Sequence, residues 1–246
     1  MNRLNGKVAL ITGSGRGMGK EIALKLAAEG ATIVAHYAAS ASGAQDVVKT
    51  IIDQGGQAVA YQADISKREE VKQLFAHIDQ FPGQLDIVVN SSGVSAGGNL
   101  KNLDDSELEW MLGVNLRGPL YIASEAATRL GEGGRIINIG STMSEFPFPG
   151  SGIYSATKAA LKSFTECWAR ELGKQGITVN TVIPGATRPG KADTTPEHYR
   201  SFFENASPFG RVGRAEEIAD VIAFLASPEA SWVSGAHILA NGAATT

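Results

Sequence analysis

Several kinds of residue and segment are scarce or missing in this 246-residue sequence, and each absence excludes a class of protein. Its one cysteine, Cys167, cannot form a disulfide within the chain, which is typical of a reducing compartment. No stretch reaches the ~18 consecutive apolar residues of a membrane span. The net charge of −3 gives no excess of basic residues for nucleic acid. We therefore expect a soluble, cytoplasmic protein that binds neither membranes nor nucleic acid.

Metal-ligand spacing is also missing. The histidines His36, His77, His198 and His237 lie far apart and follow no metal-binding pattern. We therefore expect no metal site. Cys167 falls within a helical pattern and is expected to be a packed thiol, because cysteine is often buried.

Glycine, in contrast, is abundant, at 29 of 246 residues, or about 12% against the usual ~7%. The rest of the chain alternates short apolar runs with longer amphipathic ones. Strands are expected at 7–12, 31–36, 57–62, 85–90, 135–140, 177–183 and 236–240. Helices are expected at 18–30, 43–54, 67–80, 104–130, 152–174 and 215–226. This alternation predicts an α/β fold over residues 1–246: a single doubly wound Rossmann-type domain with a parallel sheet of about seven strands and helices on both faces.

Residues 184–214 stand apart because they contain several prolines and little periodicity. A long segment of this kind is usually a functional loop or disordered. It follows the strand at 177–183, so it should lie at the carboxyl edge of the sheet, where such folds bind ligands. We expect a substrate lid within about 186–214.

A glycine-rich loop at residues 12–19 joins the first expected strand to the first helix. Its glycines permit a sharp turn and close approach of a phosphate, and the helix N-terminus offers N–H groups and a positive dipole end. A P-loop is disfavoured because Lys20 is followed by Glu21 rather than Ser or Thr. A turn without a ligand is the other alternative, but the βαβ context favours a dinucleotide. The expected contacts are Gly13, Ser14, Arg16, Gly17, Met18 and Gly19.

The end of the second strand, residues 34–40, has no acidic residue to bind a ribose 2′-hydroxyl. Arg16 in the glycine loop would attract a 2′-phosphate, although it could also be an ordinary solvated charge. The sequence therefore favours NADP(H) over NAD(H), with Tyr37 and Ser40 among the residues that bind it.

Tyr154 and Lys158 are four residues apart in an expected helix, so they share one face. An ammonium beside a phenol favours the phenolate, so we expect Lys158 to lower the pKa of Tyr154 and make it a proton donor and acceptor. Ser141 follows the fifth strand at the same sheet edge, and its hydroxyl could hold the substrate oxygen. Asn115 lies inside the long helix before that strand, where an amide can interrupt helix hydrogen bonding and hold water. A bare Tyr-x-x-x-Lys pair is more often a plain helix face, but the glycine loop and Ser141 favour catalysis.

These segments together resemble the classical subgroup of the short-chain dehydrogenase/reductase family, from Gly6 to about Gly242. The segments that match are TGSGRGMG at 12–19, Asp64 in ADIS, NSSG at 90–93, Asn115 in VNLRG, Ser141, YSATK at 154–158 and Pro184-Gly185. Within the family the chain resembles 3-oxoacyl-acyl-carrier-protein reductases. Two basic positions that those enzymes use for the acidic carrier are Glu132 and Gln175 here, which argues against a carrier-bound substrate.

The resemblance implies a role for each matching residue. Tyr154 would be the general acid/base, and Lys158 would lower its pKa and bind the nicotinamide ribose. Ser141 would orient the substrate carbonyl, and Asn115 would hold a water of a proton relay. Further cofactor contacts would be Asp64 and Ile65 at the adenine, Asn90 and Gly93 along the groove, and Pro184, Gly185 and Thr187 beside the nicotinamide. Helices 104–130 and 152–174 match the surfaces by which family members form a homotetramer or homodimer.

The chain departs from the family pattern in three segments. Ser91 and Ser92 replace the usual Asn-Ala, and serines could refill the lost hydrogen bonds. Pro189 stands where a threonine often binds the pyrophosphate, which puts that contact in doubt. Residues 240–243 read Ala-Asn-Gly-Ala in place of the usual Asp-Gly-Gly segment.

The function expected from the sequence is an NADP(H)-dependent oxidoreductase that interconverts a carbonyl and a secondary alcohol. The substrate would be a small molecule, and apolar walls for it could come from Phe146, Phe148, Tyr199, Phe202 and Phe203, which could equally be plain packing. A catalytically silent, nucleotide-sensing protein is the first alternative. An epimerase or dehydratase is the second, but such relatives usually carry a larger substrate domain.

Overall fold

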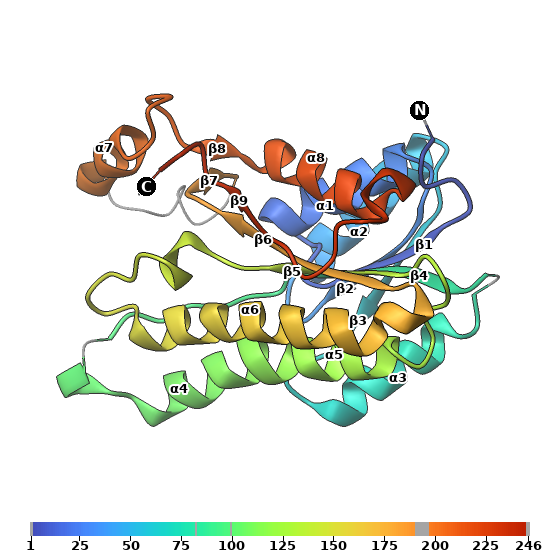
Figure 1. The fold of residues 1–246 in the computed structure, drawn as a ribbon, viewed down its shortest axis with the longest axis horizontal. Coiled ribbons are helices and arrows are strands. Elements are labelled where there is room, and N and C mark those ends of the chain that lie inside the picture. The colour runs from blue at the N-terminus through green and yellow to red at the C-terminus, as the bar shows by residue number, and fades with distance from the viewer. Residues whose placement is uncertain (1, 82, 99, 190–196, 245–246) are drawn as a thin grey trace.

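The computed structural model describes all residues except 1, 82, 99, 190–196 and 245–246 (Figure 1). Its main sheet contains β1 Val8–Ile11, β2 Thr32–Tyr37, β3 Ala58–Gln62, β4 Leu85–Asn90, β5 Arg135–Ile139, β6 Thr178–Pro184 and β9 His237–Ala240. The seven strands are parallel, in the order β3-β2-β1-β4-β5-β6-β9. The expected doubly wound sheet is confirmed. The strand order reverses between β1 and β4, and folds of this kind bind ligands at the carboxyl edge beside such a point.

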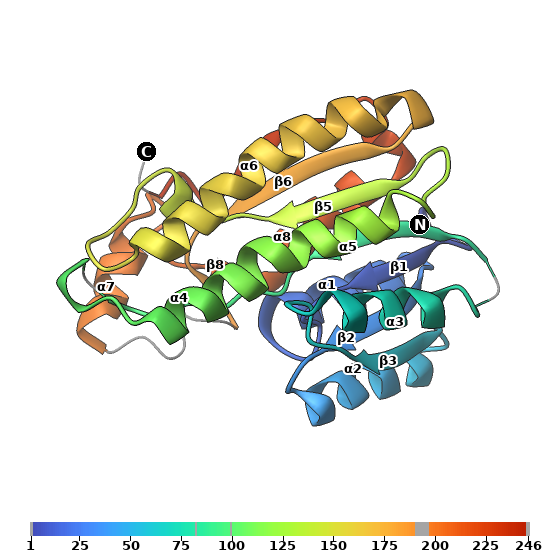
Figure 2. The same ribbon diagram turned by 90° about the horizontal axis from the view of Figure 1, so that it is seen from below.

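Helices cover both faces of this sheet (Figures 1 and 2). One face carries α1 Gly17–Ala28, α2 Ala41–Asp53 and α8 Ala215–Ala226, and the other carries α3 Arg68–Ile78, α4 Asp105–Leu112, α5 Gly118–Ala126 and α6 Gly152–Leu172. Each face has its own core. Ile22 of α1 meets Ile222 of α8 in one core, and Phe75 of α3 meets Ile122 of α5 in the other. Strands that are apolar on both sides are thus buried on both sides.

The helix expected over 104–130 changes its hydrogen bonding midway. A π-helical turn, Gly113–Arg117, separates α4 from α5 and carries Asn115. Turns of this kind are rare and often occur at functional sites. Asn115 thus lies inside the long helical stretch, at the turn where its hydrogen-bonding pattern is interrupted.

The segment 184–214 contains structure that the sequence analysis did not predict. Strands β7 Thr187–Arg188 and β8 Gly213–Arg214 pair in parallel, and α7 spans Glu197–Asn205. The β7–β8 pair brings the two ends of the segment together. The part of the expected lid at 190–196 lies outside the described residues.

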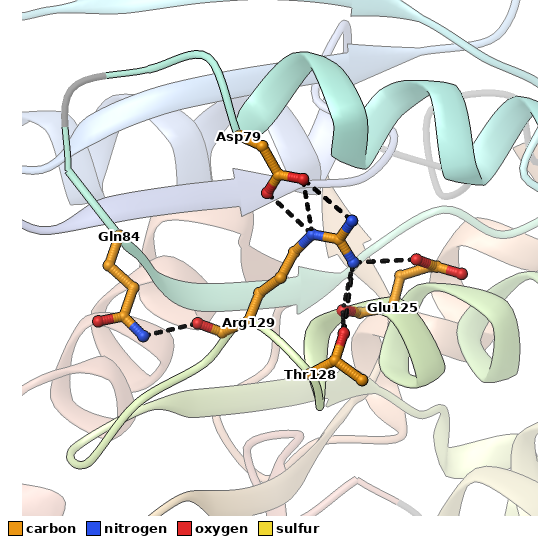
Figure 3. Close-up of polar contacts among 5 residues, drawn as sticks. All are labelled: Asp79, Gln84, Glu125, Thr128 and Arg129. Carbon is orange, nitrogen blue, oxygen red and sulfur yellow. Dashed lines mark hydrogen bonds and ion pairs between the residues drawn. The ribbon is translucent and has the colours of Figure 1, made fainter.

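The opposite end of the sheet is held by a cluster of polar contacts around Arg129 (Figure 3). Arg129 Nε donates to Asp79 at 2.9 Å, and Arg129 Nη1 donates to Glu125 Oε2 at 2.9 Å. Gln84 Nε2 donates to the carbonyl of Arg129 at 2.7 Å. These bonds connect the end of α3 to the end of α5, at the edge of the sheet opposite the carboxyl edge.

Cys167 is exposed on α6, so the prediction of a packed thiol is wrong. The buried face of α6 contains Leu161, Thr165, Trp168 and Leu172, a spacing of about one turn. Cys167 falls beside this face. Among the described residues, no helix combines the length and apolar character needed to cross a membrane.

Candidate active site

The glycine-rich loop packs directly against the start of α2. A Cβ atom on Gly15 would lie 2.9 Å from the carbonyl oxygen of Ser40, and one on Gly43 would lie 2.1 Å from the carbonyl oxygen of Gly15. Gly13 and Gly17 have φ of +70° and +54°, in the region that favours glycine. The N-termini of α1 and α2 therefore meet at this loop.

The charge around this loop suits an anion. Neither α1 nor α2 has an acidic residue in its first turn, so the positive dipole ends are not neutralised. Arg16 is the N-cap residue of α1, and its side chain is exposed. The glycine loop and the two helix ends fit the pyrophosphate of NADP(H). Arg16 fits its 2′-phosphate. Tyr37 and Ser40 lie half-buried between β2 and α2.

The same loop is tied to the end of β4. The Oγ1 of Thr12, which is fully buried, accepts the main-chain N–H groups of Ser91 and Ser92, each at 3.0 Å. Gly13 lies against Ser92, where a Cβ would be 3.0 Å from Ser92 Cα. The two serines that depart from the family pattern are thus held through their backbone.

The side chain of Asn90 on β4 is buried and bonded to the neighbouring strand β5. Its Nδ2 donates to Asn138 Oδ1 at 2.9 Å, and Asn138 Nδ2 donates to Thr165 Oγ1 at 2.8 Å. Thr165 shares a further 2.7 Å hydrogen bond with Thr181. All four residues are buried. This chain, which the sequence analysis did not predict, connects α6 to β4, β5 and β6.

The expected adenine contacts lie at the end of β3. Asp64 Oδ1 accepts the N–H of Ser66 at 3.0 Å and its hydroxyl at 2.6 Å. Burial alone would raise the pKa of Asp64, but these bonds and nearby Lys67 outweigh burial and lower it. The side chain of Ile65 is buried against Gly118 of α5.

Lys158 is buried on α6, and its ammonium group donates to the main-chain carbonyl of Ile139 at 2.7 Å. The Nζ atom lies 5.9 Å from the centre of the Tyr154 ring. A Cβ on Gly93 would lie 3.5 Å from the same Nζ. The structure therefore brings Tyr154, Lys158 and Gly93 together at the carboxyl edge, as expected.

The pKa of Tyr154 moves opposite to the expectation. Burial raises it, and a hydrogen bond with Ser141 lowers it by less. Burial dominates, so the net pKa of Tyr154 is raised in this structure, whereas the sequence analysis expected it to be lowered. Ser141 caps the 3₁₀ turn Thr142–Ser144, and its Oγ accepts the N–H of Met143 at 3.2 Å.

Asn115 is fully buried and fixes the loop after β4. Its Oδ1 accepts the N–H of Val94, and its Nδ2 donates to the carbonyl of Val94, both at 2.8 Å. Nδ2 also contacts Thr157 Oγ1 at 3.3 Å. The expected role in holding a water stays a prediction. The amide itself positions Val94 and, through Thr157, the helix that carries Tyr154.

Residues 240–244 brace the segment after β6. A Cβ on Gly185 would lie 3.0 Å from Asn241 Cβ, and the hydroxyl of Ser207 donates to the carbonyl of Gly242 at 2.6 Å. Pro184 and Thr187 are both buried. The altered C-terminal segment therefore supports both the Pro184-Gly185 turn and the end of α7.

Aromatic side chains gather above this edge. Phe148 follows Ser141 in the chain, and its ring lies 5.9 Å from that of Phe202 on α7, at 71°. Phe202 meets Phe203 in the same edge-on way. Phe202 and Phe146 remain 49% and 41% exposed. The side chain of Tyr199 lies outside the described residues. Among the described residues, no three His, Cys, Asp or Glu side chains gather as metal ligands.

His36 is a buried residue of this region that the sequence analysis did not assign to the site. Its side chain contacts Gly13 in the glycine loop and Ala63 beside Asp64. A lone histidine within an apolar strand gives no sequence signal for this role, because the contacts depend on how three strands are placed.

Comparisons with known proteins agree with this geometry. A family model described as enoyl-(acyl carrier protein) reductase matches residues 13–245. Elsinochrome reductase 1 of Elsinoe fawcettii is 40% identical over 99% of this chain and 96% of that protein. Versicolorin reductase 1 of Dothistroma septosporum is 39% identical over 98% and 97%.

Solved structures resemble the fold closely. A short-chain dehydrogenase from Burkholderia cenocepacia in complex with NADP has a TM-score of 0.94 and 37% identity, over 99% of this chain and 100% of that one. An angucycline C-6 ketoreductase with bound NADP has a TM-score of 0.92 and 37% identity, over 98% and 96%.

Proposed function

The chain belongs to the short-chain dehydrogenase/reductase family and is an oxidoreductase, and on that premise we propose that it uses NADPH to reduce the ketone of a fused-ring aromatic compound to a secondary alcohol. The observation that carries the proposal is the hydrogen-bonded pair Ser141–Tyr154 beside the buried ammonium of Lys158. This trio stands at the carboxyl edge, next to a loop suited to a dinucleotide.

NADP(H) is the cofactor. Gly13, Ser14, Arg16, Gly17, Met18 and Gly19 would form the loop around its phosphates, beside Tyr37 and Ser40. Asp64, Ile65, Asn90, Gly93, Pro184, Gly185 and Thr187 would line the rest of the groove. The short-chain dehydrogenase and the angucycline ketoreductase that share this fold were both solved with NADP. When bound, NADPH supplies the hydride that reduces the carbonyl carbon.

Tyr154 provides the proton for the carbonyl oxygen. Its raised pKa keeps the phenol protonated at neutral pH, which suits an acid in the direction of reduction. Ser141, which is hydrogen-bonded to Tyr154, orients the carbonyl toward that hydroxyl. Lys158, held by Ile139, contributes positive charge that favours the phenolate once the proton has left.

The substrate class is inferred from two aromatic side chains, Phe148 in the loop before α6 and Phe202 on α7. Phe148 and Phe202 meet edge to face while Phe202 stays half exposed, so a flat aromatic ring could join them with little rearrangement. The relatives named elsinochrome reductase, versicolorin reductase and angucycline ketoreductase point to fused-ring ketones. Residues 186–214, which contain α7, serve as the substrate lid.

We extend the proposal to assembly and location. Trp110 on α4 and Leu120 on α5 are 50% and 39% exposed, and Trp232 near the sheet edge is 98% exposed. Second copies of the chain would cover these surfaces in a homodimer or homotetramer, which light scattering during gel filtration would measure. Cytoplasmic location agrees with the single, unpaired cysteine.

The test compares two ketones of the same skeleton, aromatic α-tetralone and saturated decalone, by the loss of NADPH absorbance. We expect kcat/KM to be about tenfold higher for α-tetralone, and higher with NADPH than with NADH. Equal values for the two ketones would contradict the aromatic substrate. NADPH binding without turnover of any ketone would contradict the enzyme and support a nucleotide sensor.

A further inference from the structure

His36 lies in the middle of three segments that the cofactor site uses. It belongs to β2 and is 1% exposed. Its Nδ1 receives the N–H of Gly13 at 3.2 Å, and its Nε2 lies 2.9 Å from the carbonyl oxygen of Ala63. One imidazole ring thus spans from the glycine loop to the residue before Asp64.

The two contacts fix the protonation of the ring. Nδ1 accepts a hydrogen bond and so carries no proton, which leaves the proton on Nε2, where it is donated to Ala63. Burial lowers the pKa of His36 to about 4, although the Ala63 carbonyl and the charge of Asp64 act in the opposite direction. The ring is therefore neutral at neutral pH, in the one form that satisfies both neighbours.

The main chain of His36 holds the same loop. Its carbonyl oxygen accepts the N–H of Ser14 at 3.0 Å and the Ser14 hydroxyl at 3.2 Å. Gly13 and Ser14 thus direct their N–H groups back toward β2. The N–H groups farther along, at the start of α1, are those that a helix leaves for a ligand.

We propose that His36 is a positioning residue for NADP(H): its Nε2-protonated imidazole is hydrogen-bonded to both Gly13 and Ala63 and so holds the glycine loop in the position that binds the pyrophosphate. This inference rests on the proposed NADP(H) site and adds to it a residue that does not touch the cofactor. Buried hydrogen bonds are costly to leave unmade, so the effect should appear in cofactor affinity.

Two amide variants separate the two bonds. In His36→Asn the amide reaches the position of Nδ1 and can accept from Gly13, but it cannot reach Ala63. In His36→Gln the amide reaches the position of Nε2 and can donate to Ala63, but it leaves Gly13 without an acceptor. His77→Gln on α3 is the matched control, because His77 packs against Tyr61 and Phe81 instead.

The first measurement is the dissociation constant of NADP⁺ and of 2′,5′-ADP, by calorimetry on the apoprotein. We expect both constants to rise about tenfold in His36→Gln, to rise less in His36→Asn, which keeps the bond to Gly13, and to stay within about twofold of wild type in His77→Gln. In turnover, the loss should appear in KM for NADPH rather than in kcat. Unchanged constants in a folded His36→Gln protein would overturn the proposal, and so would a fall in kcat alone.

The second measurement uses the unsubstituted protein and does not depend on any variant folding. Nitrogen NMR of the imidazole should show an unprotonated Nδ1 and a protonated Nε2 at neutral pH, and NADP⁺ should slow hydrogen exchange at Gly13. A protonated Nδ1 would overturn the proposal. If NADP⁺ binds in this way and no ketone is reduced, the proposed reaction fails while the role of His36 stands.

Discussion

The adenosine side and the substrate side of the carboxyl edge are built in opposite ways. On the adenosine side, Thr12, Ser14 and His36 are buried, and their bonds connect β1, β2, β3 and β4. On the substrate side, Phe146 and Phe202 are about half exposed and belong to loops or to the short helix α7. Buried polar bonds specify one geometry, whereas exposed aromatic rings can adjust to different partners. Under the proposed function, the fold would fix cofactor binding, and surface side chains would determine substrate choice.

The Tyr154→Phe substitution tests whether the proton donor can be removed without a loss of cofactor binding, and it should have the largest effect. Removing the hydroxyl removes the proton donor, so kcat should fall about a thousandfold, or about 4 kcal/mol. The dissociation constant of NADPH should change little, since the phenol ring remains. Stopped-flow turnover and calorimetric titration measure the two quantities. Retention of more than a tenth of the wild-type kcat would exclude Tyr154 as the acid.

Acid unfolding tests how firmly the adenosine side is fixed. Between pH 6.5 and 4 the unfolded chain binds a proton at His36 that the folded chain does not, because burial lowers the folded pKa to about 4. The free energy of unfolding should therefore fall as pH falls through this window, by about 3 kcal/mol for this residue.

Urea unfolding at fixed protein concentration, at several pH values, measures this fall. His36→Gln should lack it, and His77→Gln should keep it. The arginine partners of Glu29 and Glu217 lower the pKa of these two carboxyl groups to about 2. Their contribution to the free energy of unfolding is lost at lower pH, as pH falls from 4.5 to about 2. An equal fall in wild type and His36→Gln between pH 6.5 and 4.5 would contradict the prediction.

Arg16 lies at the exposed rim of the adenosine side, and its substitution should have a smaller effect. A charge-assisted hydrogen bond contributes about 2 kcal/mol, so Arg16→Gln should weaken NADPH about 10- to 30-fold. NADH, which has no 2′-phosphate, should bind equally well to both proteins. Lys20→Gln on the same helix is the control for loss of one positive charge. Fluorescence titration measures the dissociation constants of both cofactors for all three proteins. An equal loss of affinity for NADH and NADPH in Arg16→Gln would show that Arg16 does not bind the 2′-phosphate.

The same contrast explains what the sequence could predict. The seven strands of the main sheet and α1, α2, α3, α6 and α8 follow from apolar spacing within each segment. Tyr154 and Lys158 are paired by one helix alone. His36 was not found because its partners, Gly13 and Ala63, come from other segments of the sheet edge. The bounds of the π-helical turn at 113–117 depend on backbone hydrogen bonding, which apolar spacing does not encode, although the amide of Asn115 indicated an interruption there. No side chain is buried among residues 201–205 of α7, so packing against the core did not mark this helix in the sequence.

Phe202 tests the substrate side, and its substitution should have the smallest effect. In Phe202→Leu the residue stays apolar but loses the ring that meets Phe148. An aromatic pair adds about 1 kcal/mol beyond its buried area, so KM for α-tetralone should rise about fivefold, while KM for decalone and the affinity for NADPH stay constant. Phe209→Leu is the control, because Phe209 lies after α7 and packs against Gly242. If both ketones lose affinity equally, Phe202 supplies apolar area alone, and the substrate side recognises size rather than aromatic character.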